Sequence, residues 1–291
     1  MAERRTDQGV QPYKFGGKEL DRMNNLDFYD FDARAYYPAL MRFTRPDPMS
    51  EKYPGISPYA YCNNNPVRFV DLHGDSVDIA QLVIHDNINN TNYTQTLMTD
   101  LQSQTGLTIS TSANGQMIYD KDKNGNPIIA TTKDANGNII QVGSATARTQ
   151  LVGLIDNQST VSVGITNKGS QGGGSDIWLD PSQINSFISG AVGMDNKTLG
   201  WGMTFLHESY HTTIGGGLAD YPFNPGPVVN NMNTIRSELN ALGGDYGQRL
   251  DYYATPLGTS YNYLPFNSNA KRAIDAGFIP GTMPGDKFIR R

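Results

Sequence analysis

The most constraining feature of the sequence is a stretch around residue 207 in which apolar and ionisable residues share one helical repeat. Its apolar side chains recur at spacings of three and four, at Leu199, Met203, Leu206 and Tyr210. This spacing predicts an amphipathic helix over residues 199–213. The helix contains His207-Glu208-Ser-Tyr-His211, and therefore two of the four His of the chain. Because residues four apart lie one turn apart on one helix face, both imidazoles should lie side by side.

A His-Glu-x-x-His pattern on a helix is typical of zinc hydrolases. Both imidazoles can bind one tetrahedral Zn²⁺ at about 2.0–2.1 Å. Glu208 is then placed to take a proton from the attacking water, which the metal acidifies to a pKa of roughly 7, and to deliver it to the leaving amine. Chance produces this pattern in about one chain per thousand of this His and Glu content. The alternatives are a solvated polar helix face and a buried His pair.

Zinc needs a third protein ligand, and the fourth position is left to water. The metzincin pattern would require Gly at position 214 and His at position 217, where this chain has Ile214 and Gly217. That class of zinc peptidase is excluded, so we expect a downstream carboxylate. Asp220, nine residues after His211, is one candidate, as in zinc peptidases that use an Asp.

Glu238 is the other carboxylate and the one we expect to bind the metal. It borders the apolar stripe of a second expected helix at residues 229–242. A carboxylate that faces inward is costly unless it is paired or bound to a metal. An ion pair with Arg236 or Arg249 is the alternative role for Glu238.

Residues 1–75 differ in composition from the rest of the chain. They are rich in aromatic residues and Pro, which favours short strands and turns. Their motifs resemble the Rhs/YD-repeat-associated core of the Bacteroidetes type. These motifs are Tyr13-Lys-Phe-Gly-Gly-Lys-Glu-Leu-Asp21, Phe28-Tyr-Asp-Phe31, Arg42-Phe43 with Pro46-Asp-Pro48, and Tyr59-Ala-Tyr-Cys-Asn-Asn-Asn-Pro-Val-Arg68.

The resemblance to the Rhs core implies a role for the rest of the chain. In that family the core ends a β-shell of YD repeats that encloses a variable C-terminal toxin, so residues 76–291 would be the toxin. Asp71-Leu-His-Gly74 stands where the family has Asp-Pro-x-Gly. We therefore expect residues 1–75 to be a partial core tip, a remnant of the shell.

A second resemblance concerns the C-terminal region. Asn233-Thr-Ile-Arg-Ser-Glu-Leu239, followed by Arg249-Leu-Asp-Tyr252, is similar to effector and polymorphic-toxin metallopeptidases of the gluzincin kind. The resemblance implies that Glu238 is the third zinc ligand and that Arg236 orients a ligand by hydrogen bonding. A phenol or a guanidinium is also expected to stabilise the oxyanion of the reaction, and Tyr252 and Tyr253 are the candidates.

From about residue 76 the patterns predict an α+β domain. We expect helices at 91–104 and 145–155, and strands at 107–111, 116–119, 161–165 and 176–180, of which the last is a candidate edge strand for an extended substrate. Together with the zinc helix, these elements predict a zincin-like metallopeptidase domain over 76–291 with a small antiparallel sheet. A short β- and turn-rich Rhs-core remnant over 1–75 precedes it.

Composition limits the partners. The net charge of −5, without a Lys/Arg cluster, argues against nucleic acid, and no apolar run is long enough for a membrane span. Cys62 is the only Cys, which excludes an internal disulfide and a Cys-based zinc site. The start of the chain lacks the apolar region of a signal peptide. We expect synthesis in the bacterial cytoplasm, and export or injection as a secreted toxin.

These features predict a hydrolase, a zinc-dependent endopeptidase that acts as the C-terminal toxin of an Rhs-type polymorphic toxin. Its expected partners are Zn²⁺, a protein substrate in a target cell and a cognate immunity protein. One alternative is a zinc amidase or peptidase acting on cell-wall peptides. Another is a catalytically inactive structural or interaction module.

Overall fold

The computed structural model describes residues 20–21, 27–30, 34–46, 57–61, 77–112, 115–157, 159–221, 225–258, 260–281 and 285–291. The chain divides into two compact units, Met1–Asp75 and Ser76–Arg291. Much of the sequence that resembles the Rhs core, including residues 13–19, 62–68 and 71–74, lies outside the described residues.

The first unit contains a small antiparallel sheet. Its strands follow the order β1-β2-β3-β4, with bounds Leu20–Asp21, Phe28–Asp30, Ala35–Tyr37 and Arg42–Phe43. Tyr36, Phe43 and Tyr61 form its buried cluster. The rings of Tyr36 and Tyr61 lie 4.3 Å apart, centroid to centroid. The aromatic residues of this region therefore supply a local core.

The second unit is built on a six-stranded mixed sheet of order β11-β12-β10-β5-β7-β6. Its strands are β5 (Val77–Asp78), β6 (Ile109–Thr111), β7 (Gln116–Tyr119), β10 (Val161–Ile165), β11 (Gln171–Gly173) and β12 (Asp176–Leu179). The expected antiparallel sheet is corrected here, because β10 pairs in parallel with both β5 and β12. Parallel neighbours require a long crossover, and the chain makes one through three helices between β5 and β10.

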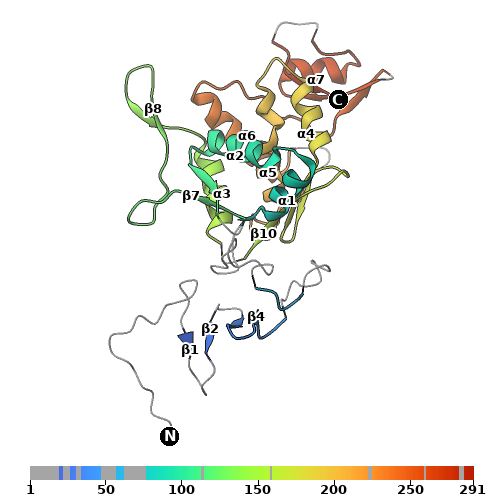
Figure 1. The fold of residues 1–291 in the computed structure, drawn as a ribbon. Helices are drawn as coiled ribbons and strands as arrows, with labels where there is room; N and C mark the ends of the chain where they lie inside the picture. The colour runs from blue at the N-terminus through green and yellow to red at the C-terminus, as the bar shows by residue number, and fades with distance from the viewer. Residues whose placement is uncertain are drawn as a thin grey trace. The chain divides into compact units, whose positions relative to one another are not determined.

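Helices make up much of the second unit, so the fold is mixed α and β, as expected of an α+β domain (Figure 1). Their bounds are α1 Ala80–Asn89, α2 Tyr93–Thr105, α3 Ala145–Ile155, α4 Pro181–Gly190, α5 Trp201–Ser209, α6 Pro227–Ala241 and α7 Ser268–Asp275, with a 3₁₀ turn, η5, at Asn196–Leu199. Within the described ranges, none of them is long and apolar enough to cross a membrane.

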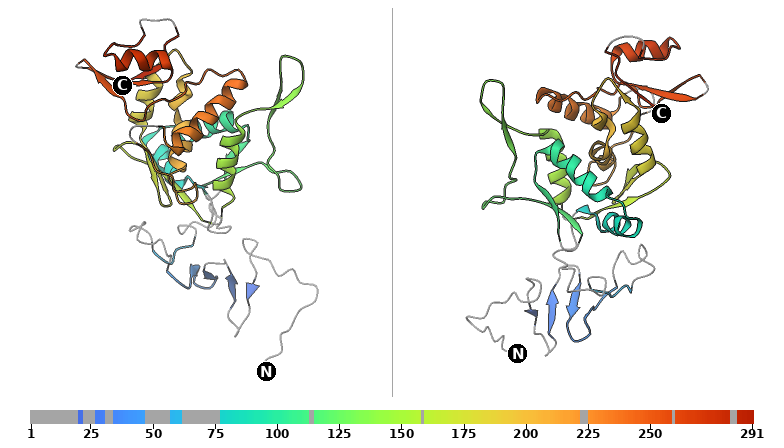
Figure 2. Two further views of the ribbon diagram at one scale, coloured as in Figure 1. Left: turned by 180° about the vertical axis from the view of Figure 1, so that it is seen from behind. Right: turned by 45° about the horizontal axis from the view of Figure 1, so that its top comes forward.

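Two smaller β elements complete this unit. The β8–β9 hairpin, Thr131–Lys133 and Ile139–Gln141, extends away from the helices (Figure 1). A second sheet of order β13-β16-β15-β14 lies with α7 near the C-terminus (Figure 2). Its strands are β13 Ala191–Val192, β14 Thr255–Leu257, β15 Tyr261–Pro265 and β16 Phe288–Arg290. Leu199, Leu264, Phe266 and Ile289 form a buried cluster that connects it to η5.

Helix α5 is the central helix of the unit. All nine of its residues are buried, and it packs against α2, α3, α6, β11 and β12. Gly202 lies close to α2, where an added Cβ would come within 3.0 Å of Cβ of Asp100. Because the whole helix is buried, the backbone that carries His207 and Glu208 is held in place by packing on all sides.

Candidate metal centre

The two His of the predicted zinc helix lie at its C-terminal end. His207 is in the last turn of α5, and His211 follows in a tighter turn in which its backbone N–H donates to the carbonyl of Glu208. The helix ends at Ser209, earlier than the expected residue 213. Thr212 donates its hydroxyl to the carbonyl of Ser209, and such side-chain hydrogen bonds compete with the helical backbone ladder.

The imidazoles of His207 and His211 converge on the carboxylate of Asp220. The two Nε2 atoms are 3.4 Å apart. Oδ2 of Asp220 lies 3.4 Å from Nε2 of His207 and 3.1 Å from Nε2 of His211. All three side chains are mostly shielded from solvent. The structure thus brings together the two predicted His ligands and the alternative carboxylate, Asp220.

Glycines reverse the chain between His211 and Asp220. Gly216 and Gly217 have φ angles of 119° and 59°, which side-chain-bearing residues rarely adopt. After the reversal, the N–H of Leu218 donates to the carbonyl of Tyr210. The carbonyl of Leu218 lies 2.6 Å from Nδ1 of His211. This contact holds the His211 ring with Nε2 toward Asp220, as outer hydrogen bonds commonly do for metal-binding His.

These atoms fit a tetrahedral divalent metal. Bonds of 2.0–2.1 Å to a tetrahedral zinc ion place two ligand atoms roughly 3.3–3.4 Å apart, which is close to the three separations found here. Oδ1 of Asp220 is buried and has no hydrogen-bond partner in the part of the chain that the structure describes. An unpartnered buried carboxylate oxygen is costly unless a cation compensates it.

Glu208 lies beside this cluster and is held by the edge strand. The backbone N–H of Gly172, in β11, is close enough to the carboxylate of Glu208 to lower its pKa. Burial raises the pKa of Glu208 to about 7, against a smaller opposing effect of His211. One ligand-type atom from each of His207, Glu208 and His211 lies within 4.8 Å of the others. Asp220 lies nearer than this limit to both imidazoles.

The electrostatics of the cluster put His207 and Asp220 in the form that binds a metal, whereas His211 carries a proton in the absence of one. Burial lowers the pKa of His207 to about 4, so its imidazole is neutral at pH 7. Hydrogen bonding to Asp220 raises the pKa of His211 to about 9. Burial alone would raise the pKa of Asp220, but hydrogen bonds from both imidazoles bring it far below its usual value. The cluster therefore holds a proton that a cation could replace.

A Gly172→Ala substitution should strongly impair the site, whereas Gly173→Ala should be tolerated. A Cβ at Gly172 would lie 1.9 Å from the backbone carbonyl oxygen of Glu208, while one at Gly173 would meet nothing within 4 Å. Because backbone cannot move aside cheaply, we expect a loss of about 1–3 kcal/mol in the free energy of unfolding. A displaced Glu208 should also cost about 100-fold in activity. Denaturant unfolding of both variants measures the difference, and equal stabilities would contradict this packing.

Glu238 is not part of the cluster. Its carboxylate accepts hydrogen bonds from the hydroxyl of Ser144 and from the N–H and hydroxyl of Thr146, at the N-terminus of α3. The expectation that Glu238 faces the two His is thereby corrected. An inward carboxylate needs donors, and the unpaired groups of a helix N-terminus supply them. Neither Arg236 nor Arg249 forms an ion pair with it in the described residues.

A Glu238→Gln variant should lose about 1 kcal/mol of unfolding free energy, as for other helix caps, since the carboxylate is partly exposed. Hydrogen bonds from Ser144 and Thr146 lower the pKa of Glu238 although burial opposes them. A lowered folded-state pKa means that the contribution is complete above about pH 4.3 and is lost as the pH falls through the folded value. Unfolding of both proteins at pH 7 and pH 3 tests this, with Ser237→Ala as the control. A difference that grows toward pH 3 would contradict it.

Arg236 does not touch a metal ligand in this structure. It is almost fully buried and donates to the carbonyl of Thr198, 3.3 Å from Nε and 3.1 Å from Nη2. Its Nη1 also donates to Oδ1 of Asn233. Asn233 in turn accepts from the N–H of Arg249 and donates to the carbonyl of Arg249. The expected role of Arg236 is therefore corrected: it supports the segment that carries Arg249 and Tyr252.

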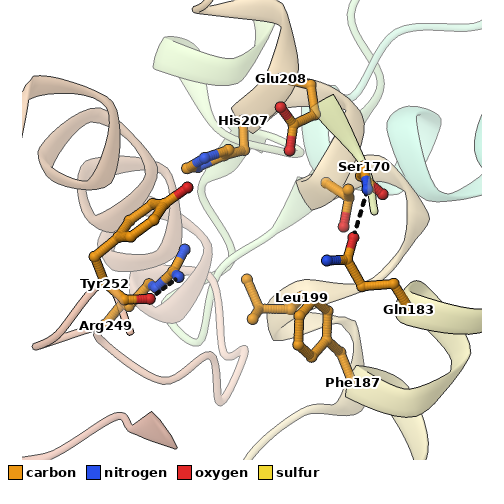
Figure 3. Close-up of a pocket in the computed structure, with 9 residues that line it drawn as sticks. Ser170, Gln183, Phe187, Leu199, His207, Glu208, Arg249 and Tyr252 are labelled. Atoms are coloured by element: carbon orange, nitrogen blue, oxygen red, sulfur yellow. Dashed lines mark hydrogen bonds between the residues drawn. The ribbon is translucent and has the colours of Figure 1, made fainter. Parts of the chain in front are cut away.

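Arg249 and Tyr252 lie on the same side of a small pocket as His207 (Figure 3). The Tyr252 ring lies 6.4 Å from the His207 ring, centroid to centroid. Burial and the neighbouring Asp220 carboxylate raise the pKa of Tyr252 far above its usual value. The guanidinium of Arg249 donates to the carbonyls of Asp251 and Tyr252 and lies over the Tyr252 ring. Tyr253, the other phenol considered, is exposed.

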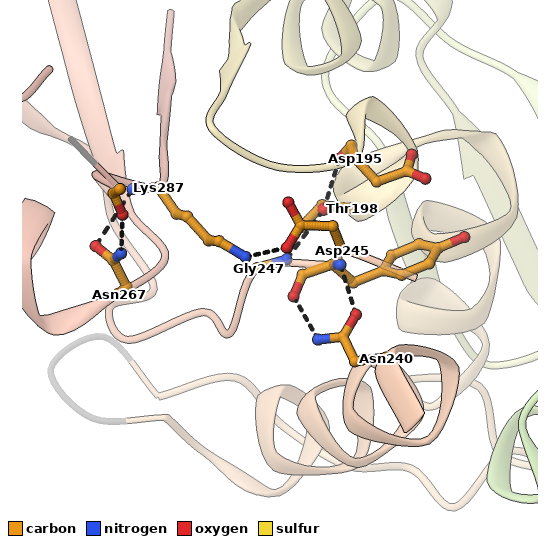
Figure 4. Close-up of polar contacts among 9 residues, drawn as sticks. Asp195, Thr198, Asn240, Asp245, Gly247, Asn267 and Lys287 are labelled. Atoms are coloured by element: carbon orange, nitrogen blue, oxygen red, sulfur yellow. Dashed lines mark hydrogen bonds and ion pairs between the residues drawn. The ribbon is translucent and has the colours of Figure 1, made fainter. Parts of the chain in front are cut away.

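The sequence did not single out Arg249 as a site residue. It lies in an irregular segment that follows α6, where no periodicity predicts which side a residue faces. The segment is nevertheless well anchored (Figure 4). The Asp245 carboxylate pairs with Lys287, and the backbone carbonyl of Asp245 accepts from the N–H of Asp195. The N–H of Gly247 donates to the hydroxyl of Thr198. Asn240 bonds both the N–H and the carbonyl of Tyr246.

Comparison with known proteins adds little to this picture. No family model and no solved structure matches the chain. A curated protein described as a phosphate-binding protein, from an unknown prokaryotic organism, is 32% identical over 79 residues. The aligned part covers 24% of this chain and 21% of that protein, so the chain spans about a fifth of its length. So short a match does not assign a family.

Proposed function

We propose that residues 76–291 form a zinc-dependent peptidase of zincin type in which Asp220, not Glu238, is the third ligand. The observation that carries this proposal is the convergence of Nε2 of His207, Nε2 of His211 and Oδ2 of Asp220 at separations of 3.1–3.4 Å. A buried carboxylic side chain, Glu208, lies next to them. Ligands of this number and type leave a coordination position open, as in catalytic zinc sites.

Each neighbouring side chain then has a role in amide hydrolysis. Bound zinc would supply a Lewis acid that polarises the scissile carbonyl and acidifies water. Glu208, with its pKa raised to about 7, takes the proton from the attacking water and delivers it to the leaving nitrogen. Tyr252 and Arg249 present a phenol and a guanidinium on the same side as His207, where they can stabilise negative charge on the former carbonyl oxygen.

The substrate is expected to extend along β11. We expected this role for residues 176–180, but β12 lies between β10 and β11, which makes β11 the edge of the sheet. An extended peptide can add to an exposed edge through backbone hydrogen bonds. Because β11 also passes directly over the backbone of Glu208 at Gly172, a peptide on this edge would lie close to the catalytic carboxylate.

The biological role that we propose is that of the toxin of an Rhs-type system, with a protein in a target cell as substrate and an immunity protein as inhibitor. The sequence resemblance of residues 12–75 to the Rhs core supports it. One alternative is an enzyme that hydrolyses cell-wall peptides. The other alternative is a catalytically inactive module.

Metal analysis and peptide profiling together test the proposal. The purified full chain should contain one zinc per molecule after dialysis, and zinc at a thousand times its dissociation constant should stabilise the apoprotein by about 4 kcal/mol. Zinc-loaded protein incubated with a proteome-derived peptide mixture should generate new termini, which chelated protein should not. A chain that binds no zinc would favour the inactive module. Cleavage of cell-wall peptides alone would favour the amidase.

A further inference from the structure

A small cavity opens beside Glu208 and His207. It has a volume of about 90 Å³, and its walls include Ser170, Gln183, Phe187, Leu199, Arg249 and Tyr252 (Figure 3). Since a water occupies about 30 Å³ of liquid, the space holds roughly three to four non-hydrogen atoms. That is the size of a short side chain.

The orientation of the Gln183 amide in this cavity is determined by its neighbour. The backbone N–H of Ser170 donates to Oε1 of Gln183 over 2.8 Å. A backbone N–H can pair only with the oxygen of an amide, so the two side-chain ends cannot be exchanged. Figure 3 shows the amide nitrogen directed away from Ser170 into the cavity. This Nε2 donates to no protein group within the described residues.

The other walls of the cavity complement such a donor. The hydroxyl of Ser170 accepts from the N–H of Asp180, which leaves its own hydrogen available. The guanidinium of Arg249 adds positive charge on the side of Tyr252. Phe187 and Leu199 provide apolar walls. An isosteric apolar guest would leave the amide donor unpaired, which is the costly outcome for a buried polar group.

We propose that this cavity selects substrates with Asp or Asn next to the scissile bond, with Gln183 as the specificity-determining residue. The inference rests on the proposed peptidase function, because it takes the metal ligands as the position of the scissile carbonyl. Asp and Asn have the four non-hydrogen side-chain atoms that the cavity holds, and each offers an oxygen to Nε2 of Gln183. Leu has the same number of atoms and offers none, so it is the matched apolar guest.

Binding of small hydroxamates to the zinc-loaded full chain tests the inference without catalysis. Two series carry the side chain of Asp, Asn, Leu or Phe on the first or second carbon from the chelating group, and so represent either side of the scissile bond. In one series the Asp and Asn compounds should bind at least 10-fold more tightly than the Leu compound, and the Phe compound should bind most weakly. Equal affinities for Leu and Asn in both series would overturn the inference.

Gln183→Glu provides the matched variant. It keeps an acceptor for the Ser170 N–H but replaces the free donor by a carboxylate oxygen, so the Asp compound should lose at least 10-fold in affinity while the Asn compound is retained. Asn185→Asp places the same charge at an exposed position of α4 and should change neither affinity. An unchanged Asp-to-Asn ratio in Gln183→Glu would overturn the inference.

The two proposals fail in different ways. If no hydroxamate binds the zinc-treated chain, the proposed metal centre is overturned, and so is the proposed selectivity of the cavity. If the Asp and Asn compounds are preferred but no peptide is cleaved, the selectivity stands and only the peptidase activity is overturned.

Discussion

A Glu208→Gln variant should retain one zinc per chain and lose about 10²–10⁴-fold in the rate of peptide cleavage. Gln has the shape of Glu, so the packing of α5 against β11 should be preserved. It cannot take a proton from water, and proton transfer by a positioned side chain contributes a rate factor of this size. The measurements are zinc content and initial cleavage rates of the purified variant.

Glu238→Gln is the matched control for this experiment. It makes the same chemical change at the only other Glu of residues 76–291, whose carboxylate bonds Ser144 and Thr146. It should keep both zinc and activity. Wild-type rates in Glu208→Gln would show that this residue is not the general base. Loss of zinc from Glu208→Gln would instead indicate that Glu208 is a metal ligand.

The local elements of the second unit were largely predictable because each has its own periodicity. The helix expected at 145–155 is α3, with the same bounds, and the one expected at 229–242 is α6, at Pro227–Ala241. The strand expected at 161–165 is β10. The pairing of strands was not predictable. β10 lies between β5 and β12 in parallel, and β5 comes some eighty residues before it, so no pattern within either strand records the partner.

The same distinction applies to the candidate site. The spacing of His207 and His211 is a local property of α5, and the structure does bring these two imidazoles together. The position of Glu238 at the edge of an apolar stripe indicated only that the carboxylate faces inward. Its partners lie 92 and 94 residues earlier in the chain, at the start of α3. Asp220 reaches the two imidazoles because the glycines after His211 have positive φ angles and reverse the chain. A sequence pattern does not show where such a reversal places the following residues.

An Asp220→Asn variant should lose zinc, and this result would separate the two candidate third ligands. Replacing one oxygen by an amide nitrogen preserves the size of the side chain but removes the negative charge that faces both imidazoles. Removing the outer hydrogen-bond partner of a metal ligand typically costs 10–100-fold in metal affinity. A direct ligand should cost more, so we expect the zinc affinity of Asp220→Asn to fall by more than about 100-fold.

Glu238→Gln is the matched control for Asp220→Asn, because both variants exchange one carboxylate for one amide. Competition with a chromophoric chelator measures the zinc affinity of each, and denaturant unfolding of the metal-free proteins measures stability. Asp220→Asn should reduce zinc affinity, since its Oδ2 lies 3.1 Å from Nε2 of His211. Glu238→Gln should reduce stability alone, since its carboxylate caps α3. The reverse pattern, with zinc lost only from Glu238→Gln, would restore Glu238 as the ligand and would require α6 to rearrange when the metal binds.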